Sequence, residues 1–153
     1  MRVKDIISIV LIGFSFVGSA QIKGKAKNLV GTWQYESGGG FEVWKMEGDD
    51  LMGHGYRTSK SGDTVKVEDL KISRVNKNLV YTLLTRQNTE TGIKVNNYKF
   101  VGNRNKLYFE NVEDEIPASV KYTFGLFSKQ KLKIVIKYSD KDKPLKLKLR
   151  KVS

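Results

Sequence analysis

Residues Leu29–Met46 read LVGTWQYESGGGFEVWKM and contain both tryptophans of the chain. Aromatic and polar residues alternate on either side of the glycine run that ends at Gly40, a pattern typical of two strands joined by a turn. We therefore predict that this stretch forms a β-hairpin, with Trp33 on its first strand and Trp44 near the middle of its second.

Strand patterns continue along the rest of the chain, and no later segment keeps apolar residues at helical spacing for more than two turns. Turn residues separate most of the predicted strands. These strands are Leu29–Glu36, Phe41–Glu47, Asp50–Ser59, Thr64–Arg74, Asn78–Arg86, Gly92–Val101, Asn105–Val112, Ser119–Phe124, Lys131–Tyr138 and Leu145–Lys151. Because closure removes exposed sheet edges, we predict an all-β fold, an antiparallel up-and-down meander that closes into a barrel of about eight to ten strands.

The 153 residues are enough for one domain. Residues 1–20 have the layout of a secretory signal peptide, with two basic residues, the apolar run Ile6–Val17 and small residues up to Ala20. A membrane anchor is the alternative, but an apolar helix of this length would span only ~18 Å of a ~30 Å hydrocarbon core. We expect export to the periplasm or the cell exterior after cleavage near Ala20, a tether or single helical turn at 21–28, and a barrel domain at 29–153.

The formal net charge is +12, and much of the basic excess lies in the last quarter of the chain. There Leu132, Ile134 and Ile136 alternate with lysines, as do the leucines from Leu145 to Leu149. We interpret the lysines as the solvated face of two amphipathic strands; the alternative is a cationic patch for phosphate, lipopolysaccharide or acidic glycan. We expect a monomer. We also expect no nucleic-acid partner, since the sequence has no nucleic-acid-binding motif.

Two interruptions of the alternation predict β-bulges, which supply the curvature that a barrel needs. In the fourth strand, Val65 and Val67 share one parity whereas Leu70 and Ile72 share the other, so we place a bulge near Glu68–Asp69. The sixth strand shows the same change of parity, where Ile93 and Val95 give way to Tyr98 and Phe100. A second bulge is therefore predicted in that strand.

No strong catalytic or metal-binding motif is present. The chain has one histidine, His54, and no cysteine, so neither a His/Cys zinc site nor a cysteine nucleophile can be built. His54 is flanked by glycines, which allow a close approach to the backbone. We expect no cofactor, and we leave open whether the protein is an enzyme, since only Glu42, His54 and Glu110 supply acid or base groups at suggestive positions.

The second predicted strand offers the best candidates for a pocket. Glu42 and Trp44 share one face by parity, and a buried carboxylate needs a partner, for which Arg57 on the next strand is suited. Such a pair is either structural or a holder for a ligand's polar group. Glu110 and Asn111 precede Pro117, where the chain should leave the sheet. The candidate ligand-binding residues are Glu42, Trp44, His54, Arg57, Tyr81, Glu110, Asn111 and Tyr122.

Several short motifs follow one another in a fixed order. They are GTW at 31–33, ExW at 42–44, MGxGxR at 52–57, FEN at 109–111, the dipeptide Ile116-Pro117, and Tyr122. GTW on a first strand resembles the opening motif of lipocalins and the wider calycin group, and the ordered set resembles a family of uncharacterised exported bacterial proteins with a calycin-like barrel. The resemblance implies that Trp33 and most of the candidate residues cluster in or around the barrel cavity.

Two positions depart from these patterns. The family has a histidine in the loop before the proline, where this chain has Glu113–Glu115, so the resemblance does not extend to an activity that needs this histidine. Lipocalins also have an arginine near the C-terminus that stacks on the GTW tryptophan, and Arg150 is the candidate for that role. We expect an exported protein that holds a small, partly apolar or amphipathic ligand; the alternative is an envelope module whose cationic face contacts anionic lipid or glycan.

Overall fold

The computed structural model describes residues 24–86, 93–102, 107–111 and 117–153. The predicted signal peptide at 1–20 and the acidic run Glu113–Glu115 lie outside the described residues. Within the described part of the chain, no helix is long and apolar enough to cross a membrane.

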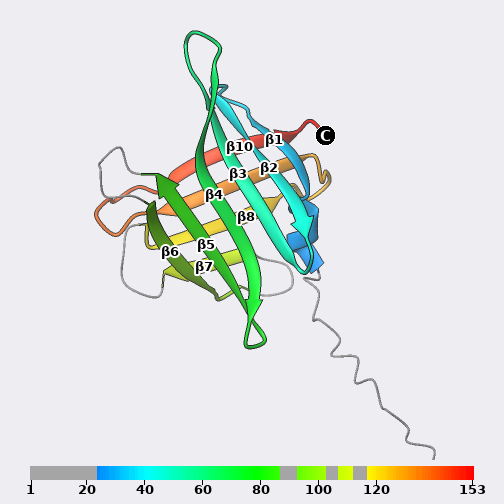
Figure 1. The fold of residues 1–153 in the computed structure, drawn as a ribbon, viewed down its shortest axis with the longest axis vertical. Coiled ribbons are helices and arrows are strands. Elements are labelled where there is room, and N and C mark those ends of the chain that lie inside the picture. The colour runs from blue at the N-terminus through cyan, green and yellow to red at the C-terminus, as the bar shows by residue number, and fades with distance from the viewer. Residues whose placement is uncertain (1–23, 87–92, 103–106, 112–116) are drawn as a thin grey trace, which may run out of the picture.

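The described residues form ten antiparallel strands that follow one another around a closed barrel (Figure 1). Each strand pairs with the next along the chain, and β1 closes the barrel by pairing with β10. The predicted fold class is therefore confirmed. The strands are β1 (Gly31–Tyr35), β2 (Gly40–Glu47), β3 (Asp50–Thr58), β4 (Thr64–Val75), β5 (Asn78–Arg86), β6 (Ile93–Phe100), β7 (Leu107–Asn111), β8 (Ser119–Phe124), β9 (Lys131–Lys137) and β10 (Leu145–Lys151).

The predicted first hairpin is formed by β1 and β2, with Trp33 paired opposite Glu42 and Gly31 opposite Trp44. Tight turns of the expected composition join other strands. At the β4–β5 turn, Asn76 and Lys77 both have positive φ (47° and 69°), as the two central residues of a type I′ hairpin turn require.

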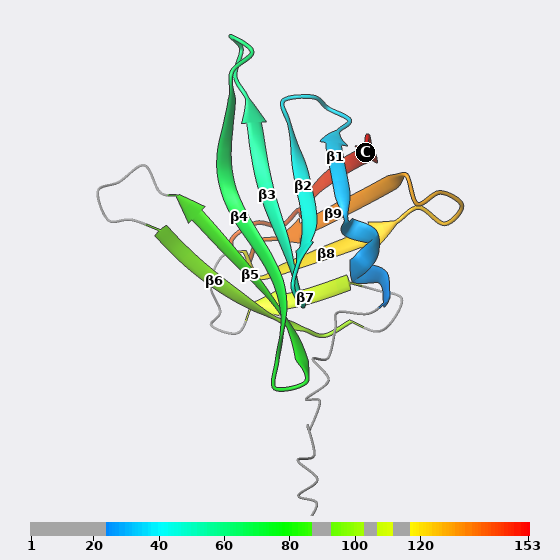
Figure 2. The same ribbon diagram turned by 45° about the vertical axis from the view of Figure 1, so that its right-hand side comes forward.

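A short 3-10 helix, η1 (Gly24–Leu29), packs against the start of β1 (Figure 2). It places Ala26 and Leu29 in the core, and the carbonyl oxygen of Leu29 accepts a hydrogen bond from the indole nitrogen of Trp33 at 2.6 Å. The Trp33 ring also packs against Phe124, with ring centroids 6.0 Å apart. We call this the Trp33 end of the barrel.

The basic residue at the Trp33 ring is Lys151, not Arg150. The Lys151 ammonium lies 5.6 Å from the ring centroid and donates a 2.6 Å hydrogen bond to the carbonyl oxygen of Val30. Arg150 is the next residue along β10, pairs opposite Gln34 and is exposed. Successive side chains on a strand point to opposite faces, so only one of the two cations can reach the tryptophan.

One predicted bulge is confirmed and the other is wrong. The β3–β4 register shifts between Gly55 and Tyr56 and leaves Val67 as the additional residue on β4, next to the predicted position. The β5–β6 register is continuous from Val80 to Arg86. Val95 therefore points outward and is 50% exposed, and Asn96 takes the inward position instead. A change of parity predicts a bulge only where every apolar residue of a strand is buried, and Val95 is not.

The alternation predicted for the last two strands is confirmed. Leu132, Ile134 and Leu149 are buried, and Ile136 and Leu147 pack partly buried against the core. The intervening lysines of β9 and β10 face outward and are exposed. These two strands thus supply an apolar wall to the barrel interior and a cationic outer surface.

Candidate functional site

The barrel interior contains a cavity of about 250 Å³. Its apolar wall comes largely from β8, β9 and β10, and most of its polar groups come from β1 to β6. The polar side chains that line it are Tyr35, Glu42, Arg57, Glu68, Tyr81, Thr85, Asn96, Tyr122 and Tyr138. Arg57, Thr85, Pro117 and Tyr138 belong to the strand ends and loops opposite the Trp33 end, which we call the Arg57 end.

Glu42 is the most deeply buried carboxyl group of the cavity, only 3% exposed. Its Oε2 accepts a 2.9 Å hydrogen bond from the indole nitrogen of Trp44, and its Oε1 accepts a 3.1 Å hydrogen bond from the hydroxyl of Tyr35. Burial raises the pKa of Glu42 to about 7; the Trp44 hydrogen bond opposes this rise, and the nearby Glu68 carboxyl adds to it. Glu42 therefore exchanges its proton near neutral pH.

Gly53 and Gly55 make room for two of these side chains. Both glycines face the interior on β3, opposite Trp44 and Glu42 on β2. A Cβ atom at Gly53 would lie 2.7 Å from Cε3 of Trp44, and one at Gly55 would lie 2.5 Å from Cγ of Glu68. The glycines on either side of His54 thus admit the Trp44 ring and the Glu68 carboxyl group close to the backbone.

Arg57 lies on the inward face of β3 at the Arg57 end, where it lines the cavity. Among the described residues, no ion pair joins Arg57 to Glu42; the Glu42 carboxyl group instead accepts hydrogen bonds from Trp44 and Tyr35. Arg57 instead acts on Glu68: burial raises the pKa of Glu68, and the positive charge of Arg57 partly opposes that rise. The cavity therefore holds two carboxyl groups with raised pKa and one guanidinium group.

Asn96 projects into the same cavity from β6 and is 4% exposed. Its Oδ1 atom is buried and accepts no hydrogen bond from any described residue. A buried acceptor without a donor is costly, by about 1–3 kcal/mol. Asn96 is therefore the polar group of the cavity that most needs a hydrogen-bond donor.

Tyrosines form the aromatic part of the cavity. The hydroxyl groups of Tyr81 and Tyr122 lie 3.3 Å apart, and burial raises the pKa of both well above the usual value. The Tyr122 ring meets Trp44 edge-on at 6.1 Å, and the Tyr81 ring packs on Tyr98 and Phe109 at 5.4 and 5.3 Å. Both tyrosines remain neutral, so their hydroxyl groups act as donors or acceptors and not as charges.

Three predicted site residues lie apart from the cavity lining. His54 faces outward on β3, where its Nδ1 lies 2.6 Å from Oδ1 of Asp69. Glu110 is exposed on the outer face of β7, and its Oε1 accepts a hydrogen bond from the Tyr108 hydroxyl. The Asn111 amide donates to the carbonyl oxygen of Pro117 at 3.3 Å.

The predicted candidates therefore divide into two groups. Glu42, Trp44, Tyr81 and Tyr122 come together inside the barrel, and the exposed Arg57 lines the cavity at its end, whereas His54, Glu110 and Asn111 do not join them. Because Glu42 points inward while His54 and Glu110 point outward, these three residues share no pocket. Within the described part of the chain, no group of three or more histidine, aspartate or glutamate side chains could hold a metal ion.

Tyr35, Glu68 and Asn96 also line the cavity, although they were not among the predicted site residues. Glu68 has the parity of Leu70 and Ile72, which are both buried, and that parity was a usable signal. Asn96 has the parity of Tyr98 in the same way.

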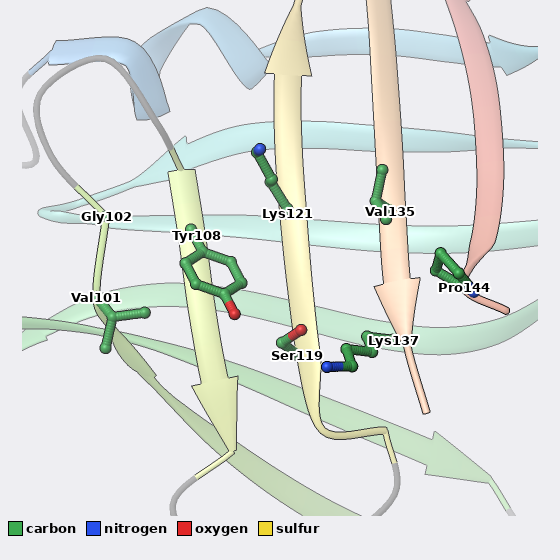
Figure 3. A pocket seen from close by; sticks show the side chains of 8 residues that line it. All are labelled: Val101, Gly102, Tyr108, Ser119, Lys121, Val135, Lys137 and Pro144. Carbon is green, nitrogen blue, oxygen red and sulfur yellow. The ribbon is translucent and has the colours of Figure 1, made fainter. Parts of the chain in front are cut away.

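A second hollow, of about 550 Å³, lies on the outer surface of the barrel over β7, β8 and β9 (Figure 3). The side chains of Tyr108, Ser119 and Lys137 turn toward one another in it, with Lys121 and Val135 alongside. Its walls are largely the outward-facing side chains of the sheet. It contains no buried polar group without a partner among the described residues, so the internal cavity is the stronger candidate site.

No protein-family model matches the chain, and a search of curated proteins found no match.

Proposed function

We propose that this protein is an exported, calycin-like barrel that binds a small, partly apolar ligand in its internal cavity. The carrying observation is the buried Oδ1 of Asn96, an acceptor without a donor among the described residues, in a cavity whose aromatic and aliphatic walls also carry the polar groups of Glu42, Glu68 and Arg57. Binding sites combine apolar walls with a few placed polar groups, and this cavity has that composition.

The volume of the cavity limits the size of the ligand. Since liquid water occupies about 30 Å³ per molecule, 250 Å³ corresponds to about eight water molecules. A compound with on the order of ten non-hydrogen atoms fits this space, whereas a long-chain lipid does not. The ligand in this proposal is therefore the size of a single substituted ring.

The polar groups define the ligand's chemistry. Asn96 Oδ1 and the carboxyl oxygens of Glu42 and Glu68 are acceptors, so the ligand should carry an N–H or O–H donor. A carboxylate ligand is disfavoured, because burial already raises the pKa of both carboxyl groups and the charge of Glu68 raises that of Glu42 further. Arg57 lies at the end of the cavity, where its charge already favours the ionised form of Glu68, so an acidic ligand would compete with that carboxyl group.

Three ring compounds of similar size test this proposal: indole, a neutral N–H donor; benzamidine, a cationic donor; and benzoate, an anionic acceptor. Binding is followed by two-dimensional NMR of the Asn96 side-chain amide and the Trp44 indole N–H. We expect shifts with indole and benzamidine, and weak or no shifts with benzoate.

The variant Asn96→Leu removes the acceptor at nearly constant volume and should weaken indole binding about tenfold. Asn97→Leu is the matched control, because Asn97 is exposed on the other face of β6 and its Oδ1 accepts a hydrogen bond from Thr82. Equal binding of all three compounds, or equal effects of the two variants, would contradict the proposal. Native mass spectrometry of protein purified from its own host tests independently whether a ligand is carried.

A further inference from the structure

We propose that the loop between β8 and β9 docks the barrel onto an anionic lipid surface, by inserting Leu126 and Phe127 between lipids while neighbouring lysines contact the headgroups. This inference is independent of the cavity ligand. The two side chains are 95% and 101% exposed, more than any other large apolar residue described. Adjacent apolar side chains without cover are the part of this surface that water solvates least well.

Hydrogen bonds within the loop close it as a tight turn, which holds Leu126 and Phe127 outward. The backbone nitrogen of Gly125 donates to the carbonyl oxygen of Lys131 at 2.9 Å, and the nitrogen of Gln130 donates to the Ser128 hydroxyl at 3.2 Å. A Cβ atom at Gly125 would lie 2.8 Å from the carbonyl oxygen of Ser128. The chain therefore closes tightly at the base of the turn.

A cationic hollow lies directly beside the apolar pair. It has a volume of about 390 Å³, and its lining includes Leu126 together with Lys131, Lys133 and Lys148. One carboxylate, Glu36, also lines it, so the hollow keeps a positive excess. Three ammonium groups next to an inserting apolar tip match the arrangement of an anionic headgroup above acyl chains.

The surrounding outer face extends this positive surface. Strands β9 and β10 contain no acidic residue, and their outward-facing cations are Lys131, Lys133, Lys137, Lys146, Lys148 and Arg150. Positive charge alone would also attract a soluble polyanion. The exposed Leu126–Phe127 pair favours a lipid surface, because only an apolar phase gains from burying these side chains.

The position of the loop leaves the ligand cavity accessible. The loop follows β8 at the Trp33 end, and Figure 2 shows it projecting beside η1. The cavity instead extends toward the Arg57 end, at the opposite ends of the strands. A barrel docked through Leu126 and Phe127 would therefore turn its Arg57 end away from the lipid.

The test is cosedimentation of the purified protein with vesicles of phosphatidylcholine alone or mixed with phosphatidylglycerol. We expect strong binding only with the anionic mixture. The double variant L126S/F127S should lower the partition coefficient at least about tenfold, since each side chain loses its transfer into lipid. Val95→Ser, which changes another exposed apolar residue on β6, should bind like the wild type.

A charge variant separates the two contributions. Replacing Lys131, Lys133 and Lys148 by glutamine should lower binding to the anionic vesicles about a hundredfold, at ~1 kcal/mol for each lysine near the surface. The control triple variant K60Q/K99Q/K143Q removes the same charge from exposed positions elsewhere and should have a smaller effect. All variants keep residues 1–20, so any binding by that segment is the same in each.

A spectroscopic readout locates the tip. Phe127→Trp places an indole at a fully exposed position, whereas Trp33 and Trp44 are buried. On binding, its emission should shift to shorter wavelength and be quenched by brominated lipid. If L126S/F127S binds as the wild type does, or if soluble polyglutamate is bound as tightly as the anionic vesicles, lipid docking through this loop is wrong and the surface is a general polyanion site.

Discussion

Replacing Glu42 by glutamine should make the barrel more stable above neutral pH and should remove part of its pH dependence. Glu42 is buried, and burial raises its pKa from the usual 4.5 to about 7. The glutamine side chain has nearly the same shape and keeps an oxygen that can accept the hydrogen bond from the Trp44 indole. It lacks the negative charge whose burial is unfavourable.

The sign follows from proton binding. Because the pKa is higher in the folded state than in the unfolded state, the folded protein holds the proton more tightly, and stability falls as the pH rises from about 4.5 through 7. The difference between the two pKa values corresponds to about 3 kcal/mol, at about 1.4 kcal/mol for each pH unit. Most of this loss falls between pH 5 and 8. Burial raises the pKa of Glu68 as well, so Glu68 contributes a slope of the same sign.

Urea unfolding followed by tryptophan fluorescence at several pH values between 5 and 9 measures this effect. The free energy of unfolding of the wild type should fall across the range, whereas that of Glu42→Gln should fall less and exceed the wild-type value at pH 8 to 9. Glu47→Gln is the control on the same strand: Glu47 is exposed, and Lys45 lowers its pKa, so its contribution is lost only below pH 5. Parallel wild-type and Glu42→Gln curves would refute the argument.

Two further substitutions test the packing of the tryptophans. Gly53→Ala should destabilise the barrel by about 1–3 kcal/mol and change the Trp44 fluorescence emission, because the added methyl group would overlap the indole ring. Unchanged stability and emission would show that the ring can move aside. Lys151→Ala should lower the free energy of unfolding by about 1–2 kcal/mol, because it removes a hydrogen bond and the contact with Trp33, whereas Arg150→Ala should lower it little. Equal midpoints of the two variants in thermal melts would count against this assignment.

The strand order could be read from the sequence because each turn and each alternation is local. The glycine run before Gly40 and the pair Asn76-Lys77 placed the ends of the preceding strands within one residue of where the structure ends them. The lysine and leucine alternation of β9 and β10 correctly assigned their inner and outer faces. Period-two patterning also placed Glu42 and Trp44 on one inward face, which is the part of the site that depends on a single strand.

The tertiary structure decided which groups meet across strands. Glu42 accepts hydrogen bonds from Trp44 and Tyr35 and forms no ion pair with Arg57. Lys151, and not Arg150, lies at the Trp33 ring. His54 faces outward, while its flanking glycines make room for Trp44 and Glu68. These outcomes depend on register and on one bulge, and a shift of one residue reverses the face of every side chain that follows. Local sequence therefore determined the hairpins and the amphipathic strands from Leu29 onward, whereas closure of the barrel determined the cavity and its polar partners.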